Sequence, residues 1–181
     1  MIDYKTFKKE YLTEWVDRSQ AARKAAEELA NKEVIPSLRD RYARIFDLDG
    51  HKVEFKGENE KNPNDPKYNL FTYDEAIKRF GEFNKEGWRL PSYEELEALC
   101  SYSYRFENKQ GIFDNRLYLP AAGYRGSDGN VISVGSLGNY WTSTPDGSSF
   151  AWNFCFYSGK RSIYRSIQSC GFSVHLVRDV K

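Results

Sequence analysis

The side chains best suited to covalent or metal chemistry are the three cysteines and the two histidines. Cys155 and Cys170 are the candidates for a pair of closely placed thiols, which could ligate a soft metal such as copper or form a disulfide. The cysteines are odd in number and lack CxxC spacing, which indicates neither a zinc site nor a complete disulfide framework. His51 and His175 stand apart from any cysteine or carboxylate at ligand spacing. We therefore expect no metal, no cofactor and no catalytic residues.

A segment rich in aromatic residues is a better candidate for function. It lies between `GNYWTSTP` (Gly138–Pro145) and `GFSVHLVR` (Gly171–Arg178), among serines and glycines. Aromatic and arginine side chains dominate protein recognition surfaces because they give a large contact area at a low entropy cost. The segment is therefore predicted to be a binding face.

Composition limits the kind of partner. Lys plus Arg number 27 and Asp plus Glu 26, so the chain has no net field that would attract nucleic acid or an anionic membrane. No run approaches 18 apolar residues, and the first residues lack the apolar core of a secretory signal. We expect a protein that is cytoplasmic as synthesised and does not insert into a membrane. A length of 181 residues suits one domain with an appendage.

The appendage is predicted to be a long amphipathic helix over residues 3–31, within an N-terminal region that covers residues 1–40. Tyr4, Phe7, Tyr11 and Trp15 recur at helical spacing, and Pro36 ends the pattern. The aromatic stripe packs on the following domain in one interpretation. In the other it joins subunits of a homo-oligomer or attaches the protein to a phage tail fibre.

Residues 41–69 are predicted to form a hairpin and a loop. Apolar and polar residues alternate on both sides of Asp49-Gly50, a dipeptide that favours tight turns, so we expect a hairpin over 42–56. The polar segment Gly57–Asn69 contains two prolines and is predicted to be an exposed, mobile loop.

Two short helices and a series of strands are expected in residues 70–181. Thr72 can cap the first helix, and Ser92 with Glu95 forms a capping box for the second. Short strands and a turn at Ser127–Asn130 follow. Helices before an antiparallel sheet indicate an α+β fold.

Five motifs in this order carry a resemblance to a known family: `GWRLPSYEELEAL`, `LPAAGYR`, `GNYWTST`, `AWNFCF` and `GFSVHLVR`. Together they resemble the C-type lectin fold of Fibrobacter-type major paralogous domains, a form shared with variable proteins of diversity-generating retroelements in gut bacteria and their phages. The resemblance covers about residues 70–181 and implies a C-type lectin-like domain with a variable region at about 140–178. The motif residues Trp88, Leu90, Pro91, Tyr124, Trp141 and Phe172 are expected to be scaffold.

The resemblance also implies which side chains contact a ligand. Phe154 and Phe156 match the fixed frame of the variable strand, and Trp152 either belongs to this frame or contacts the ligand. The candidate ligand-binding residues are Phe150, Trp152, Asn153, Cys155, Tyr157, Arg161, Ile163, Tyr164, Arg165 and Ile167. Apart from Trp152, each can arise from an Asn codon mutated at its adenines, as retroelement diversification requires. Gln168 and His175 depart from the family, which usually has Arg at both positions.

The resemblance implies a binding protein that displays a hypervariable surface to a protein or cell-surface partner, with incorporation into a phage virion as one setting. The alternative is a structural or surface-assembly domain of the same family that is not diversified. Calcium-dependent sugar binding is not expected, because `NYWTST` offers Thr142 and Ser143 where that chemistry needs acidic or amide ligands. A third reading, an enzyme of the formylglycine-generating type, would need Cys155 and Cys170 as its thiol pair.

Overall fold

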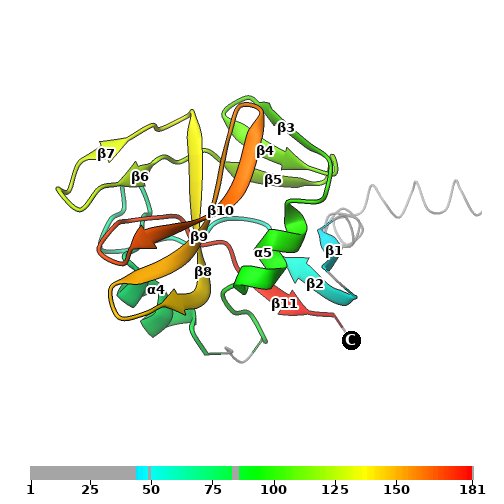
Figure 1. Cartoon of the computed structure of the whole chain (residues 1–181), viewed down its shortest axis with the longest axis horizontal. Coiled ribbons are helices and arrows are strands. Elements are labelled where there is room, and N and C mark those ends of the chain that lie inside the picture. Colours follow the sequence, from blue (N-terminus) through cyan, green and yellow to red (C-terminus); the bar gives the residue numbers. More distant parts are fainter. Residues whose placement is uncertain (1–43, 49, 83–85, 181) are drawn as a thin grey trace, which may run out of the picture. The chain divides into compact units, whose positions relative to one another are not determined.

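The structure is a computed structural model that describes residues 44–48, 50–82 and 86–180. Strands make up 45% of this part of the chain and helices 11%, so it is mostly β (Figure 1). The strands form several small antiparallel sheets, around which two short helices pack. The predicted α+β, C-type lectin-like class is therefore wrong. The long helix expected over residues 3–31, on which that class partly depended, lies outside the described residues.

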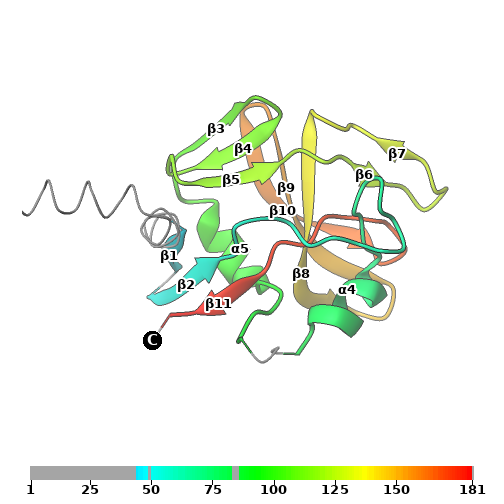
Figure 2. The same ribbon diagram turned by 180° about the vertical axis from the view of Figure 1, so that it is seen from behind.

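The predicted hairpin is confirmed. Strands β1 (Ile45–Leu48) and β2 (His51–Phe55) pair antiparallel, and Gly50 takes the positive φ of 80° that the tight turn requires. The last strand, β11 (Val177–Asp179), joins the other edge of β2 (Figure 2). The hairpin and β11 therefore form one three-stranded sheet, β1-β2-β11.

The prediction of an exposed loop over residues 57–69 is wrong for Asn62, which is 1% exposed and donates from Nδ2 to the carbonyl oxygen of Leu70 at 2.5 Å. Asp65 accepts from Arg125 at 3.0 Å in a partly buried ion pair. These two side chains attach the polar segment to Leu70 and Arg125, which the prolines alone did not indicate.

Both predicted helices are present. Helix α4 (Tyr73–Phe80) begins at Thr72, and α5 (Tyr93–Leu99) begins at Ser92. In each, the capping hydroxyl accepts from the N–H of the glutamate three residues on, and that glutamate accepts from the N–H of the capping residue. The caps fix where each helix starts, and α5 then packs on one face of the central sheet.

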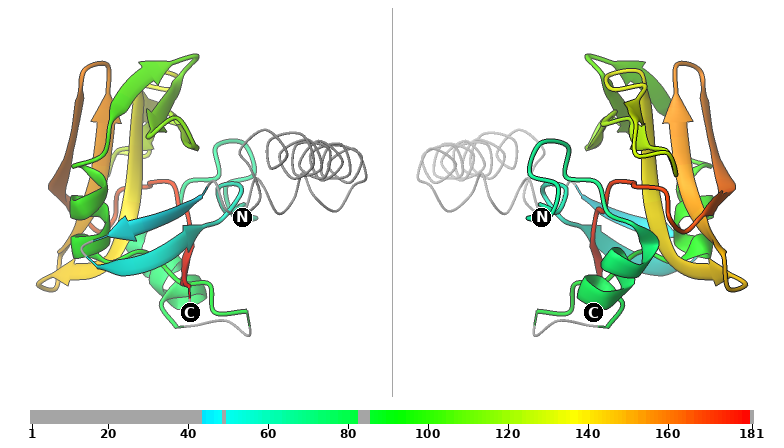
Figure 3. Two further views of the ribbon diagram at one scale, coloured as in Figure 1. Left: turned by 90° about the vertical axis from the view of Figure 1, so that its right-hand side faces the viewer. Right: turned by 90° about the vertical axis from the view of Figure 1, so that its left-hand side faces the viewer.

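The remaining strands form three further sheets. Strands β3 (Tyr104–Glu107), β4 (Gln110–Phe113) and β5 (Leu117–Pro120) are consecutive antiparallel neighbours, and β6 (Tyr124–Arg125) pairs with β7 (Val131–Ile132) across the predicted turn. The central sheet has the order β10-β9-β8, with β8 at Leu137–Asp146, β9 at Phe150–Tyr157 and β10 at Lys160–Ile167. Figure 3 shows this sheet from the side, in yellow to orange, next to β1 and β2 in cyan.

The central sheet carries a hydrophobic cluster on each face. Phe154 and Phe156 belong to the cluster that includes α5 and the β1-β2 hairpin, whereas Trp141 and Ala151 belong to the cluster with α4 and Phe172. Phe156 has no exposed surface, and its ring lies directly over two glycines, Gly111 on β4 and Gly138 on β8. A methyl group on Gly138 would come within 2.2 Å of this ring. The two sheets can approach only because neither glycine has a side chain.

Gly138→Ala is therefore expected to lower the free energy of unfolding by about 1–3 kcal/mol, the usual cost of overpacking a core. Urea denaturation measures this loss. The control is Gly57→Ala, because a methyl group there would meet Arg44 at an ordinary contact distance of 3.6 Å. Adding Phe156→Leu to Gly138→Ala should cost less than the sum of the single changes; strict additivity would show that this contact does not limit the packing.

His175 is a buried histidine that ties residues 56–59 to the C-terminal segment. Its Nε2 lies 2.8 Å from the carbonyl oxygen of Lys56, and its Nδ1 lies 2.7 Å from Oδ1 of Asn59. Burial, together with the positive charges of Arg44 and Lys56, lowers the pKa of His175 to about 4. A neutral ring carries one N–H and can donate to only one of these oxygens. The Asn59 amide in turn donates from Nδ2 to the Tyr140 hydroxyl at 3.0 Å.

We expect His175 to make the protein sensitive to acid. The unfolded histidine, with a pKa near 6.5, binds a proton more readily than the folded one, so stability is full above pH 6.5 and falls as the pH drops toward 4. The loss attributable to this residue is about 3 kcal/mol, and it is measured as the difference between wild type and His175→Gln in urea unfolding at pH 7 and pH 4. Equal losses in the two proteins would contradict the assignment. His51→Gln, at an exposed histidine, is the matched control.

Candidate binding face

The predicted ligand-binding residues all lie on the antiparallel ribbon formed by β9 and β10. A two-residue turn at Ser158-Gly159 joins the strands, with Gly159 at a φ of 79°. Residues directly opposite each other on such a ribbon point to the same face, and successive residues alternate between the faces. Asn153 opposes Tyr164, whereas Trp152 opposes Arg165. The candidate residues are therefore divided between two faces.

The face toward α5 supports the fold. Trp152 packs edge-on against Tyr93, at the start of α5, with 5.1 Å between ring centroids. Arg161 donates to the carbonyl oxygens of Cys100 and Tyr102 at 3.1 and 2.9 Å, just beyond the C-terminal end of α5, where a cation is favoured. Ile163 packs against the core cluster. These three candidates attach the ribbon to the domain.

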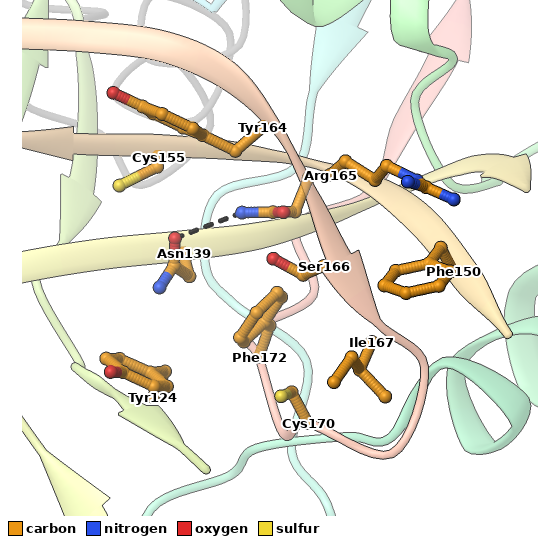
Figure 4. A pocket seen from close by; sticks show the side chains of 11 residues that line it. Tyr124, Asn139, Phe150, Cys155, Tyr164, Arg165, Ser166, Ile167, Cys170 and Phe172 are labelled. Carbon is orange, nitrogen blue, oxygen red and sulfur yellow. Dashed lines mark hydrogen bonds between the residues drawn. The ribbon is translucent and has the colours of Figure 1, made fainter. Parts of the chain in front are cut away.

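A hollow of about 420 Å³ lies on the other side of the ribbon and is open to solvent. Figure 4 shows Tyr164 across this hollow from Tyr124 and Phe172. The sequence predicted six of its lining residues, which are Phe150, Asn153, Cys155, Tyr164, Arg165 and Ile167. Its other lining residues are Tyr124, Asn139, Ser166, Cys170 and Phe172. Tyr157 is also exposed, at the tip of the ribbon.

Two asparagines form the polar part of the hollow. Asn153 is 1% exposed, and its Nδ2 donates to Oδ1 of Asn139 at 3.1 Å. The side-chain oxygen of Asn153 is buried and has no hydrogen-bond partner in the described part of the chain. In Figure 4 the amide nitrogen of Asn139 points away from Asn153, toward the side of Tyr124. We call Asn139 and Asn153 the asparagine pair.

The two thiols of the hollow are poor nucleophiles. Cys155 and Cys170 are both free, and Figure 4 places them on different sides of the hollow. Burial raises the pKa of the Cys155 thiol to about 11, and burial also raises that of Cys170. Only the thiolate attacks electrophiles or binds soft metals readily, so both groups are inert at neutral pH.

The hollow has no unpaired charge within the described part of the chain. Arg165 is the only charged residue among the described residues that line it, and it forms an ion pair with Asp146. Its guanidinium group also lies over the ring of Phe150, 3.9 Å from the centroid. Neither an anion nor a cation would find an uncompensated opposite charge here, so the hollow suits an uncharged group.

Large apolar side chains surround the hollow. Tyr164 is 38% exposed and Ile167 is 45% exposed. Ile132, 47% exposed, pairs with Tyr124 across β6 and β7 and therefore shares its face. Grouped exposed apolar side chains of this kind mark interaction sites more often than isolated ones do. We call these three residues the apolar rim.

A second cluster of polar groups consists of His51, Glu95 and Asp179, whose ligand atoms lie within 4.8 Å of one another. The guanidinium group of Arg89 already contacts both carboxylates, at 2.6 Å from Glu95 and 2.6 Å from Asp179. Two carboxylates that neutralise an arginine are poor ligands for a second cation. This cluster links α5 to β11 and is best explained as structural.

The sequence did not predict all the residues that line the hollow. Those it missed either lie outside the predicted variable strand or belong to motifs that were expected to be scaffold. Tyr124 and Phe172 were expected to be scaffold, yet each also lines the hollow. Ser166 lies two residues from Tyr164 on β10 and therefore shares its face, a signal that a strand assignment at 160–167 would have provided. No sequence signal connects Asn139 with Asn153, because the β8–β9 register brings them together.

Comparisons with known proteins give one family. A model described as a domain of unknown function, DUF8237, matches residues 106–177, which run from β3 to β11 and include the whole ribbon. No curated protein and no solved structure matches the chain. Among the described residues, no helix is long and apolar enough to span a membrane.

Proposed function

We propose that this protein is a binding protein, without enzymatic activity, that recognises a protein or cell-surface partner through the hollow and its apolar rim. One observation supports this most directly. Exposed Tyr164 and Ile167 line the hollow, and exposed Ile132 shares a face with Tyr124, which also lines it. The side-chain oxygen of Asn153, another lining residue, is buried and has no hydrogen-bond partner among the described residues. A monomer gains nothing from either feature, whereas a bound partner would cover the apolar groups and hydrogen-bond the polar one.

The arrangement fits binding better than catalysis. Among the residues that the structure describes, no carboxylate or histidine lines the hollow to move a proton, and both thiols are protonated at neutral pH. The ribbon is held firmly from its other face by Arg161 and Trp152 and at its tip by Tyr104, whose hydroxyl donates to the carbonyl oxygen of Tyr157 at 2.6 Å. A fixed backbone with exposed aromatic side chains is the design of antibody-like recognition surfaces.

Tyr164→Ala is expected to weaken binding by about 1–4 kcal/mol and to leave the free energy of unfolding nearly unchanged. The model ligands are peptide loops, selected from a displayed random library for binding to the wild-type protein. Their affinities for the wild type and for each variant are then measured. Tyr118→Ala is the matched control, because Tyr118 is 48% exposed on β5 and does not line the hollow. Ile163→Ala should instead destabilise the fold, since this side chain packs on the core. Equal losses of affinity at Tyr118 and Tyr164 would count against the proposed face.

We further propose that a retroelement diversifies this face. The DNA next to the gene should then contain a reverse-transcriptase gene and a near-copy of the segment that encodes residues 140–178, differing only at adenines. Sequencing of the locus tests this. If both are absent, the diversification proposal fails, and the alternative of a structural or surface-assembly domain that is not diversified is favoured.

A further inference from the structure

The asparagine pair offers one hydrogen-bond donor and one acceptor that the fold does not use. Asn153 gives an N–H to Asn139 and keeps its carbonyl oxygen unpartnered, while the NH₂ group of Asn139 donates to no acceptor among the described residues and lies on the side of Tyr124. Turning both amides round would exchange the roles of the two side chains but would still leave one donor and one acceptor. This property of the pair does not depend on how either amide is oriented.

A carboxamide is the simplest uncharged group that satisfies both. It carries both an NH₂ and a carbonyl oxygen. Its oxygen can accept from the NH₂ of Asn139, and its NH₂ can donate to the oxygen of Asn153 when the side chains that cover this buried oxygen move aside. A carboxylate has only acceptors and would leave the buried oxygen of Asn153 unpaired next to a negative charge. An ammonium group has only donors and would meet no unpaired negative charge, because no carboxylate lines the hollow.

The surroundings favour a protein as the source of this group. Phe150, Phe172 and Tyr124 line the hollow, and the apolar rim encloses it, which suits an aliphatic arm that ends in an amide. Rings of large apolar side chains around a buried polar anchor are typical of protein interfaces. A glycan, with hydroxyl groups all round its rings, would leave this rim without apolar partners.

We propose that the hollow is a subsite for the side-chain carboxamide of a glutamine or asparagine on a partner protein, hydrogen-bonded to Asn139 and Asn153. This inference rests on the proposed function and names the chemistry that the site selects. A ligand that leaves one of these polar groups unpaired should lose about 1–3 kcal/mol of binding free energy, or roughly 5- to 150-fold in affinity. The site should therefore prefer a carboxamide to a group that pairs with only one asparagine.

The experiment is an NMR titration of the full-length protein that follows the side-chain NH₂ signals of Asn139 and Asn153. The probes are glutamine, asparagine and glutamate, each with an acetylated N-terminus and a methylamide C-terminus, and N-acetylglucosamine. The three capped amino acids share their backbone amides, so the glutamate probe isolates the side-chain carboxamide. Capped glutamine or asparagine should shift both signals, and capped glutamate should bind at least about tenfold more weakly.

A double variant, Asn139→Leu with Asn153→Leu, tests the site without breaking the fold. Replacing both partners of a buried hydrogen bond with apolar groups of similar size is often neutral for stability, so the protein should unfold at the same urea concentration or a higher one. Its signals from Phe172 and Tyr124 should no longer respond to capped glutamine. Ser162→Ala, on β10 but outside the hollow, should respond like wild type.

Three outcomes would overturn the subsite: equal binding of capped glutamine and glutamate, an unchanged response in the double variant, or a response to N-acetylglucosamine alone. The peptide loops selected for the Tyr164→Ala experiment then show whether only the subsite fails or the proposed function fails as well. If those loops still depend on Tyr164, the face binds proteins but not through a carboxamide. If they do not, both proposals fail.

Discussion

The packing of Phe156 against two glycines is the contact on which the rest of the structure depends. The ring belongs to β9, yet it touches Gly138 on the neighbouring strand and Gly111 in a different sheet, and it stacks on Tyr140 at 5.8 Å. It therefore fixes the distance between the β3-β4-β5 sheet and the central sheet. Because Phe156 points to one face of β9, the register of the ribbon determines that Cys155 points to the other, into the hollow. The core contact thus sets the geometry of the candidate site.

The ribbon separates support from recognition by the alternation of its side chains. On the helix side, Arg161 interacts with the backbone beyond α5 and Ile163 packs on the core. On the hollow side, Tyr164 meets solvent. The alternation separates Arg161 and Ile163 from Tyr164, but it does not hold at the end of β10, because Arg165 and Ile167 share the parity of Arg161 and Ile163 and still line the hollow. Contact positions on this strand are therefore not strictly alternate.

Local signals predicted part of this structure well. The Asp49-Gly50 turn and the Ser92 capping box each depend on a few adjacent residues, and both predictions are confirmed. Strand β10 was missed because `KRSIYRSI` mixes cations with isolated apolar residues, and its strand conformation depends on pairing with β9. The fold class failed for a related reason: β3, β4 and β10, each of which pairs with a neighbouring strand across a short turn, were not recognised as strands, and without them the chain looks less rich in strands than it is. The composition of the segment was enough to predict the aromatic candidate residues. Their division between two faces could be found only from the register of β9 and β10.

The unpartnered oxygen of Asn153 is the strongest sign that selection has acted on something other than stability. Its burial without a hydrogen bond costs about 1–3 kcal/mol, a large part of the net stability of a small domain. Leucine at this position and at Asn139 would fill similar space without that cost. Departures from the rule that buried polar groups are paired occur mainly at functional sites, where a ligand completes the bonding. The asparagine pair lines the same hollow as Tyr164 and Ile167 of the apolar rim, so one partner can contact both. Affinity and selectivity would then come from different residues: the rim supplies contact area that many partners can use, and the pair accepts only those whose polar group matches.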